Sequence, residues 1–331
     1  MKKNIITEIS EDEKKYEASL RPQSFDEYYG QESLKDKLKV YVTAAKQRGS
    51  VLDHILFYGP PGLGKTTICY IIARELGANI IQTSGPALER PADLASLLSS
   101  LSRGDVLFID EIHRLKKNIE EILYPAMEDF KLDVFSGLDV DTGRKSIRID
   151  IPQFTLIAAT TKAGSISAPL RDRFGIVEKL DFYNEEEIRK IINRSSKVLN
   201  VEIEPDAEVE IAKRSRGTPR IANRLLKRIR DFAEVKFNGI ISKHVATSVL
   251  DELDVDKCGL DANDRTYLLT IIEKFGGGPV GVDTLATALG EDNETIEDIY
   301  EPYLIARGLV NRTRSGRVVT NEAYVHLDLS H

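Results

Sequence analysis

Short apolar runs alternate with segments of helical spacing through the first half of the chain. Residues 54–58 (HILFY), 106–109 (VLFI) and 154–159 (FTLIAA) are almost wholly apolar. Such runs are typical of strands that are buried on both faces of a parallel sheet. Residues 66–76 repeat isoleucine and leucine at helical spacing directly after the first run. The pattern therefore predicts an α/β fold built on a parallel sheet.

The second half of the chain changes to a helical pattern. Residues 184–254 hold three amphipathic segments, EEEIRKIINRSSKVLN, PDAEVEIAKRSRG and TPRIANRLLKRIRDFAEV. Further helices are predicted at roughly 262–275, 283–290 and 294–307, followed by the hairpin-like sequence LVNRTRSGRVVT. Helices that lead into a hairpin wing indicate a winged-helix domain at the C-terminal end.

Composition limits the classes of protein that need to be considered. A chain of 331 residues favours two or three domains. Cys69 and Cys258 lie far apart and the five histidines are scattered, so we expect neither a disulfide framework nor a structural metal. We find no signal peptide and no apolar stretch long enough to cross a membrane, and we expect a cytoplasmic protein. A net charge of −7 argues against broad nucleic-acid binding but leaves room for a local basic patch.

A glycine-rich loop stands between the first predicted strand and the helix that follows it. Gly59, Gly64, Lys65 and Thr66 satisfy the phosphate-binding pattern G-x-x-x-x-G-K-S/T. Backbone N–H groups of such a loop, with the helix N-terminus, form a cradle for phosphate oxygens. Lys65 would reach the β- and γ-phosphates of ATP, and Thr66 would ligate Mg²⁺. The alternative is a Gly/Pro-rich turn with a solvated lysine. The nucleotide-contacting residues expected in the loop are Gly59, Pro60, Pro61, Gly62, Leu63, Gly64, Lys65, Thr66 and Thr67.

Two acids follow the second apolar run, and two threonines follow the third. Asp110 would hold the water shell of Mg²⁺, and Glu111 would orient and polarise the attacking water. An acidic loop after a buried strand is the alternative. The hydroxyls of Thr160 and Thr161 would contact the γ-phosphate or the water. Downstream, SAPLRDRFG places Arg171 and Arg173 around Asp172, and from the residues alone one arginine could simply pair with that acid.

In this order the motifs resemble those of an AAA+ ATPase, and more specifically those of the RuvB family of Holliday-junction branch-migration motors. The resemblance runs from about residue 20 to about residue 324. It is carried by LRPQSFDEYYGQ (20–31), GPPGLGKTT (59–67), DEIHRL (110–115), YPAMEDF (124–130), SAPLRDRFGIV (167–177), RGTPRIANRLL (216–226) and GGGPVGVDTLATALGED (276–292).

The resemblance implies a division of the chain into three domains. A large AAA+ ATPase domain with a P-loop and parallel sheet would cover residues 1–182, and we expect roughly its first 18 residues to be flexible. A small helical lid domain would cover residues 183–255. A winged-helix DNA-binding domain would cover residues 256–331.

The resemblance also implies roles for individual residues. Arg171 would be the arginine finger that reaches the γ-phosphate bound by a neighbouring subunit of a homo-hexameric ring. Thr161 would be the first sensor and Arg220 the second. The remaining nucleotide-contacting residues, mostly around the adenine, would be Leu20, Arg21, Tyr28, Tyr29, Tyr183 and Pro219.

The local sequence around Arg220 is a separate reason to expect an anion near this residue. Gly217 reads as the end of one helix, Thr218 as the N-cap of the next and Pro219 as its first residue. An arginine in the first helical turn opposes the helix dipole at a cost of roughly 0.3 to 1 kcal/mol. A nearby anion would offset that cost. The alternative is a surface arginine without an anion, at which the helix is less stable by this amount.

Residues 129–151 read as a β-hairpin, which in the RuvB family docks the junction-binding partner RuvA. The tip, around Gly137, Thr142 and Gly143, is more polar and longer than the family's apolar tip. Its polar residues are Asp139, Asp141, Arg144 and Lys145. The resemblance implies RuvA, duplex DNA at Holliday junctions and the RuvC resolvase as partners, with a role in recombination, DNA repair and the SOS response.

The charge of the winged-helix region indicates how it would contact DNA. Residues 257–331 carry seven Lys and Arg against twelve Asp and Glu, and the predicted third helix is acidic. Acids on that helix would repel phosphates, whereas Arg312, Arg314 and Arg317 lie in a stretch without acids. We therefore expect these three arginines to contact the sugar-phosphate backbone without reading sequence. The family's usual wing, RTPRGR, here reads RTRSGR, so one arginine is displaced by a position.

The sequence leaves three functions open. The first is a hexameric ATP-driven motor that moves duplex DNA during branch migration. The second is an ATP-switched protein such as a clamp-loader subunit or a replication initiator. The third is a winged-helix transcription regulator with an attached nucleotide sensor, which the acidic third helix disfavours because base recognition needs donors on that element.

Overall fold

The computed structural model describes residues 19–137 and 145–329, which form two compact units. One unit comprises Arg21–Gly59 and Leu63–Asp181, and the other comprises residues 19–20, Pro60–Gly62 and the chain from Phe182 onward. Two sequence-based expectations lie outside the described residues. These are the flexible N-terminal segment and the polar hairpin tip with Asp139, Asp141, Thr142, Gly143 and Arg144.

The first unit is built on a parallel sheet of five strands in the order β2-β3-β6-β1-β7. The predicted strands correspond to β1 (Ile55–Tyr58), β3 (Val106–Asp110) and β6 (Thr155–Thr160). The two edge strands are β2 (Ile80–Ser84) and β7 (Ile176–Lys179). All five strands run in one direction, so their carboxyl ends share one edge of the sheet.

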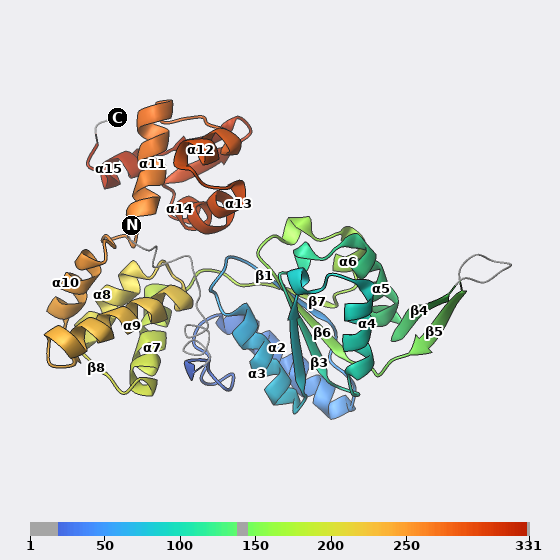
Figure 1. Cartoon of the computed structure of the whole chain (residues 1–331). Helices are drawn as coiled ribbons and strands as arrows, with labels where there is room; N and C mark the ends of the chain where they lie inside the picture. The colour runs from blue at the N-terminus through green and yellow to red at the C-terminus, as the bar shows by residue number, and fades with distance from the viewer. Residues whose placement is uncertain (1–18, 138–144, 330–331) are drawn as a thin grey trace. The chain divides into compact units, whose positions relative to one another are not determined.

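Helices cover both faces of this sheet (Figure 1). On one face lie α2 (Glu32–Arg48) and α3 (Lys65–Leu76). On the other lie α4 (Pro91–Ser100), α5 (Lys117–Glu128) and α6 (Ala168–Arg171). Leu56, Leu107 and Leu156 from three adjacent strands form a core with Leu98 of α4 and Leu123 of α5, and all five are fully buried. Burial on both faces explains why these strands are continuous apolar runs.

Short elements connect the strand ends of the first unit. Three turns of 3₁₀ helix lie at Gly85–Ala87, Ile112–Arg114 and Ala163–Ser165.

The predicted hairpin is present as β4 (Lys131–Gly137) paired antiparallel with β5 (Lys145–Asp150). It begins directly after α5, so any movement of that helix would carry the hairpin with it.

The second unit begins with four helices that match the three amphipathic segments and the residues after them. They are α7 (Glu185–Val198), α8 (Pro205–Arg214), α9 (Pro219–Lys236) and α10 (Lys243–Glu252). The connection between α7 and α8 contains β8 (Glu202–Ile203), and the connection between α9 and α10 contains β9 (Ile240–Ile241). These two short strands pair in parallel. Asn184 begins α7 with a capping box to Glu187, which satisfies two orphan N–H groups.

The remaining elements form a winged helix within the same unit. Helices α11 (Ala262–Phe275) and α12 (Val282–Leu289) fall within one residue of their predicted bounds. The predicted third helix is three consecutive segments: α13 (Asn293–Thr295), a π turn (Ile296–Tyr300) and α14 (Glu301–Ala306). Pro302 has no N–H to donate to the carbonyl of Asp298, and the helix widens just before it. The wing is β10 (Val310–Thr313) with β11 (Gly316–Val319), and α15 (Asn321–His326) follows.

The expected fold class is therefore confirmed: a parallel P-loop sheet domain, a helical lid and a winged helix. Among residues 19–137 and 145–329, no helix is both long and apolar enough to cross a membrane.

Candidate nucleotide site and DNA-contacting wing

The predicted phosphate loop joins the end of β1 to the start of α3 and has left-handed backbone at three glycines. Gly59, Gly62 and Gly64 have φ of 140°, 79° and 97°. A Cβ at Gly59 would lie 2.4 Å from the carbonyl oxygen of Leu180, so no other residue fits there without movement. The chain can therefore make this loop only with glycine at these positions.

Lys65 is the first residue of α3 and lies against the loop. Its side chain is largely buried, and Nζ donates to the carbonyl oxygen of Gly59 at 2.7 Å. The ammonium thus lies across the loop, at the positive end of the α3 dipole. A cation and a helix N-terminus at one place attract anions, as phosphate binding requires.

Two residues beside the loop fit a magnesium ion by their chemistry. Thr66 supplies a hydroxyl in the first turn of α3, and Asp110 supplies a carboxylate at the end of β3. Burial raises the pKa of the Cys69 thiol well above its ordinary value, and the negative charge of Asp110 raises it further, which places that carboxylate near α3. Oxygen ligands of this kind are those that Mg²⁺ prefers.

The ends of β3 and β6 bring four polar side chains together. The Thr161 hydroxyl donates to Oε2 of Glu111 at 3.3 Å, and Nδ1 of His113 lies 3.2 Å from the same oxygen. Nδ1 of His113 also lies 2.9 Å from the hydroxyl oxygen of Thr160. Glu111 has φ of 50°, a conformation that is uncommon outside glycine and that recurs at functional sites.

His113 is the member of this cluster that the sequence reasoning missed. It lies in the DEIHRL motif, yet from the sequence alone its ring could face any neighbour. Strand order provides the missing information. Because β3 pairs with β6, the residues after both strands lie side by side, and the ring contacts Thr160 and Glu111 together.

The predicted second sensor, Arg220, belongs to the same unit as loop residues Pro60–Gly62. The N–H of Arg220 donates to the carbonyl oxygen of Gly62 at 3.3 Å. A Cβ at Gly62 would stand 2.8 Å from Cγ2 of Thr218 and 3.1 Å from Cβ of Arg220. Pro219 is the first residue of α9, as predicted, but the Thr218 side chain makes no capping hydrogen bond and donates instead to the carbonyl oxygen of Arg216.

The residues expected around the adenine are divided between the units. Arg21, which lies over the Tyr70 ring, belongs to the sheet unit together with Tyr28 and Tyr29. Leu20 and Tyr183 belong to the other unit. There the carbonyl oxygen of Leu20 accepts from Nη1 of Arg194 at 2.7 Å. The N–H of Tyr183 donates to Gly217 at 2.9 Å.

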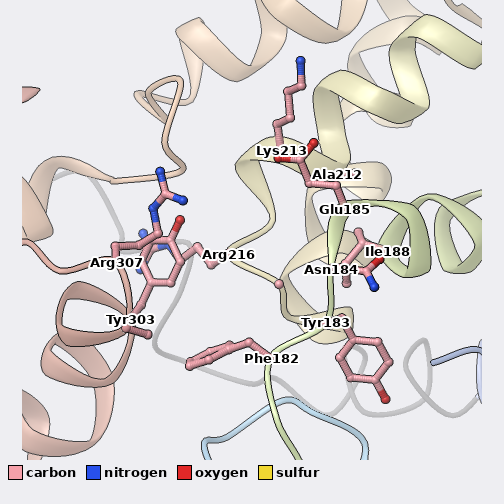
Figure 2. Close-up of a pocket in the computed structure, with 12 residues that line it drawn as sticks. Phe182, Tyr183, Asn184, Glu185, Ile188, Ala212, Lys213, Arg216, Tyr303 and Arg307 are labelled. Carbon is pink, nitrogen blue, oxygen red and sulfur yellow. The ribbon is translucent and has the colours of Figure 1, made fainter. Parts of the chain in front are cut away.

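A pocket of about 410 Å³ lies within the second unit, and Tyr183 is one of the residues that line it. Figure 2 shows Tyr303 and Arg307 on one side of it and Tyr183 and Asn184 on the other. The guanidinium of Arg216 lies 5.4 Å from the Tyr303 ring centroid. Of the residues predicted to contact nucleotide, Tyr183 alone lines this pocket among the described residues.

Arg171 and Arg173 have different surroundings, which resolves the alternative left open by the sequence. Arg171 ends α6 and is exposed, and its side chain has no hydrogen bond or ion pair with residues 19–137 or 145–329. Arg173 lies over the Tyr124 ring, 4.4 Å from its centroid, and its Nη2 is 3.1 Å from Glu128. Neither arginine pairs with Asp172 within the described part of the chain.

The wing arginines also differ from one another in exposure and in their partners within the domain. Across the hairpin Arg312 pairs in register with Arg317. The Arg317 side chain is only 7% exposed and lies 2.7 Å from Glu301 and 2.9 Å from Glu297. We expected Arg317 to contact DNA, but its guanidinium is used inside the domain. Arg312 is 54% exposed and pairs with Glu297 at 2.5 Å, and Arg314 is exposed at the turn.

A P-loop between β1 and a helix, two acids after β3 of the same sheet and a helical lid together define an AAA+ ATPase. Three family models match the chain in series: the Holliday junction DNA helicase RuvB P-loop domain (residues 20–180), the RuvB AAA lid domain (183–256) and the RuvB C-terminal winged helix domain (257–328). The chain belongs to the RuvB family.

Solved structures agree with this assignment. The Thermotoga maritima RuvB Holliday junction branch migration motor is 50% identical, with a TM-score of 0.87 over 95% of this chain and 99% of that one. A mutant of the same protein in which a proline is replaced by glycine is 51% identical, with a TM-score of 0.88 over 94% of this chain and 99% of that one. Both similarities extend across all three domains.

Proposed function

We propose that this protein is an ATP-dependent motor that drives branch migration of Holliday junctions. ATP would be hydrolysed at the seams between subunits of a homo-hexameric ring, and the ring would grip duplex DNA without reading its sequence. The observation that carries the proposal is the cluster of Glu111, Thr161 and His113 at the edge of the sheet that also bears the phosphate loop. Membership of the RuvB family supports the choice of DNA substrate.

The residues of the sheet edge would divide the work of hydrolysis. Lys65 would move from Gly59 to the β- and γ-phosphates, where its charge stabilises the developing negative charge. Thr66 and Asp110 would hold Mg²⁺, which when bound supplies neutralisation of phosphate charge. Glu111 would accept the proton of the attacking water, with Thr161 and His113 fixing its carboxylate.

Groups from outside the sheet edge would complete the site. Arg171 would reach the γ-phosphate of the neighbouring subunit, and its exposure without a hydrogen bond or ion pair to the described residues supports this role. Arg220 would contact phosphate from the lid. Nucleotide contacts by Leu20, Arg21, Tyr28, Tyr29, Tyr183 and Pro219 remain part of the proposal on the resemblance alone.

The winged helix and the hairpin would engage the partners. Arg312 and Arg314 would contact the phosphate backbone of duplex DNA, because both are exposed on the wing. The hairpin of β4 and β5 would dock RuvA, and the motor would act in the same pathway as the RuvC resolvase.

A branch-migration assay tests the proposal directly. A synthetic four-way junction with one labelled strand is incubated with the protein, with and without RuvA, in the presence or absence of ATP. We expect ATP-dependent conversion of the junction to duplex products by the wild type and by Lys117→Ala, an exposed-lysine control. Lys65→Ala should give none because it lacks the phosphate-binding ammonium. ATP hydrolysis without junction conversion under any of these conditions would instead favour an ATP-switched loader or initiator.

A further inference from the structure

The motif YPAMEDF lies on α5 and has no role in the site described above. Near it, Glu120 carries a largely buried carboxylate, 8% exposed. Its Oε2 accepts hydrogen bonds from the hydroxyls of Ser167 at 2.7 Å and Tyr124 at 3.2 Å. No cation pairs with Glu120 within the described residues. A buried carboxylate costs free energy unless its oxygens are satisfied, so these two hydroxyls fix its position and are fixed by it.

Ser167 is the N-cap of α6, the short helix that ends in Arg171. Its hydroxyl oxygen accepts from the N–H of Leu170 at 3.4 Å, and its carbonyl oxygen accepts from the N–H of Arg171 at 3.0 Å. With only four residues, α6 has too few internal hydrogen bonds to hold its own geometry. Its orientation is therefore set by contacts with its surroundings, among them the burial of Leu170 and the hydrogen bond from Ser167 to Glu120.

A second set of contacts fastens the far end of the same segment to α5. The guanidinium of Arg173 lies over the ring of Tyr124, the residue that also donates to Glu120, and it pairs with Glu128 one turn further along. Figure 1 shows α6 beside α5, in agreement with these contacts. Residues 167–173 are thus attached to α5 before and after Arg171, while the Arg171 side chain itself stays exposed.

We propose that Glu120 is a positioning residue for the arginine that crosses the subunit seam. It touches neither nucleotide nor water, and it acts through Ser167 by setting the direction in which α6 presents Arg171. This inference rests on the proposed function, because it needs hydrolysis at a seam between subunits. A displacement of about 1 Å at a catalytic group can cost about a hundredfold in rate, so a loosened α6 should slow hydrolysis measurably.

Glu120→Ala removes the acceptor of both hydroxyls. We expect the kcat of ATP hydrolysis to fall about tenfold or more, with the KM for ATP and the affinity for a fluorescent ATP analogue nearly unchanged. Glu120→Gln keeps a carbonyl oxygen for the two hydroxyls and should retain most of the activity. Glu121→Ala is the matched control, because Glu121 is exposed on the same helix and its side chain makes no hydrogen bond or ion pair among the described residues.

A mixing experiment separates positioning from a general structural role. In mixed rings, Lys65→Ala subunits cannot bind nucleotide but present an intact α6 to their neighbours. Glu120→Ala subunits have an intact nucleotide site and a misdirected α6, so mixing them with Lys65→Ala subunits should raise hydrolysis above the sum of the two separate proteins. Damage to the fold of the Glu120→Ala subunit, or to its own nucleotide site, would not be repaired in this way. Should Glu120→Ala fail to fold, Ser167→Ala removes the same hydrogen bond and is tested identically.

The outcomes distinguish this inference from the function on which it rests. Wild-type kcat for Glu120→Ala overturns the inference. So does the absence of rescue in the mixture when an arginine variant, tested in parallel, is rescued by the same Lys65→Ala subunits. If neither Arg171→Ala nor Arg173→Ala is rescued, ATP is not hydrolysed at a seam between subunits. The proposed function and this inference are then both overturned.

Discussion

The hydroxyl of Thr161 donates a hydrogen bond to Oε2 of Glu111 across 3.3 Å, joining the residues that follow two adjacent strands. Nδ1 of His113 lies 3.2 Å from the same oxygen. Two groups therefore hold one carboxylate oxygen in place. A general base must be fixed within reach of the proton it removes, and these contacts would fix Glu111 in the role proposed for it.

Replacing Glu111 with glutamine should separate nucleotide binding from hydrolysis. The amide keeps the shape of the side chain but cannot accept the water proton, so we expect ATP turnover to fall by about 10² to 10⁴. Thr161→Val removes one of the two hydrogen bonds and should cost about tenfold, equivalent to about 1.4 kcal/mol. Both variants should bind a fluorescent ATP analogue as the wild type does. Wild-type turnover by Glu111→Gln would show that another group is the base.

The exposed position of Arg171 predicts that it acts on a neighbouring subunit. Arg171→Ala should bind ATP but hydrolyse it slowly, with a loss of about 10³ or more. Mixing it with Lys65→Ala subunits should restore activity, because each defect then lies in a different part of the shared site. Turnover is measured across a range of mixing ratios.

Arg173→Ala is the informative companion to this experiment. Arg173 is held by Tyr124 and Glu128 within its own chain, so we expect its loss to loosen α6 and to lower activity less than loss of Arg171 does. Both variants are mixed with Lys65→Ala. If Arg173→Ala shows the larger loss and is rescued while Arg171→Ala stays active, the role of the interfacial arginine belongs to Arg173.

On the wing, two arginines should contribute to DNA binding and one to stability. Arg312→Ala and Arg314→Ala should weaken binding equally on unrelated duplex sequences, each reducing the salt slope by about 1. The exposed ion pair between Arg312 and Glu297 is worth little in water, so DNA phosphate can replace it. Arg317→Ala should instead destabilise the winged helix by about 3 to 5 kcal/mol, since it leaves Glu301 buried and unpaired.

Two measurements check this division among the wing arginines. Fluorescence anisotropy at several salt concentrations gives the affinity and the salt slope, and urea unfolding gives the stability of the winged helix. A strong dependence of the Arg312→Ala effect on DNA sequence would contradict backbone contact. Reduced DNA affinity in Arg317→Ala with unchanged unfolding would return that residue to the DNA-contacting group.

The comparison between sequence and structure shows which physical signals are local. Runs such as VLFI predicted strands correctly because burial on both faces leaves little room for polar residues. The phosphate loop could likewise be predicted from the sequence, because its glycines are required by the local backbone conformation. Both signals are complete within about ten residues of chain.

The ion pairs of Arg317 could not be predicted from the sequence because they depend on tertiary packing. The sequence shows three arginines in a stretch without acids, and only the packing of the wing on α14 brings Glu301 to one of them. Likewise, the link between Glu120 and Ser167 joins residues 47 positions apart, which no local pattern can reveal. Charge is visible in a sequence, but which charges are paired inside the fold is not.

His54 directly precedes β1 and should make the stability of the sheet unit depend on pH. The N–H of Leu156 donates to Nδ1 of His54 at 2.9 Å, and Nε2 lies 3.1 Å from the carbonyl oxygen of Met127. These partners require a neutral ring with its proton on Nε2, and burial lowers the pKa of His54 below its ordinary value. Protonation of Nδ1 would break the bond to Leu156.

The folded-state pKa of His54 lies below the unfolded value of about 6.5. Between these two pKa values, the folded state binds fewer protons than the unfolded state. The stabilisation is therefore complete above about pH 6.5 and is lost as the pH falls toward the folded-state pKa, by at most about 1.4 kcal/mol per pH unit. His54→Asn keeps an acceptor for Leu156 but cannot titrate. The difference in urea-unfolding free energy between wild type and variant should thus shrink as the pH falls from about 7.5 to about 5.5. The other four histidines cancel in this difference, so a constant gap would show that His54 has the same pKa in both states.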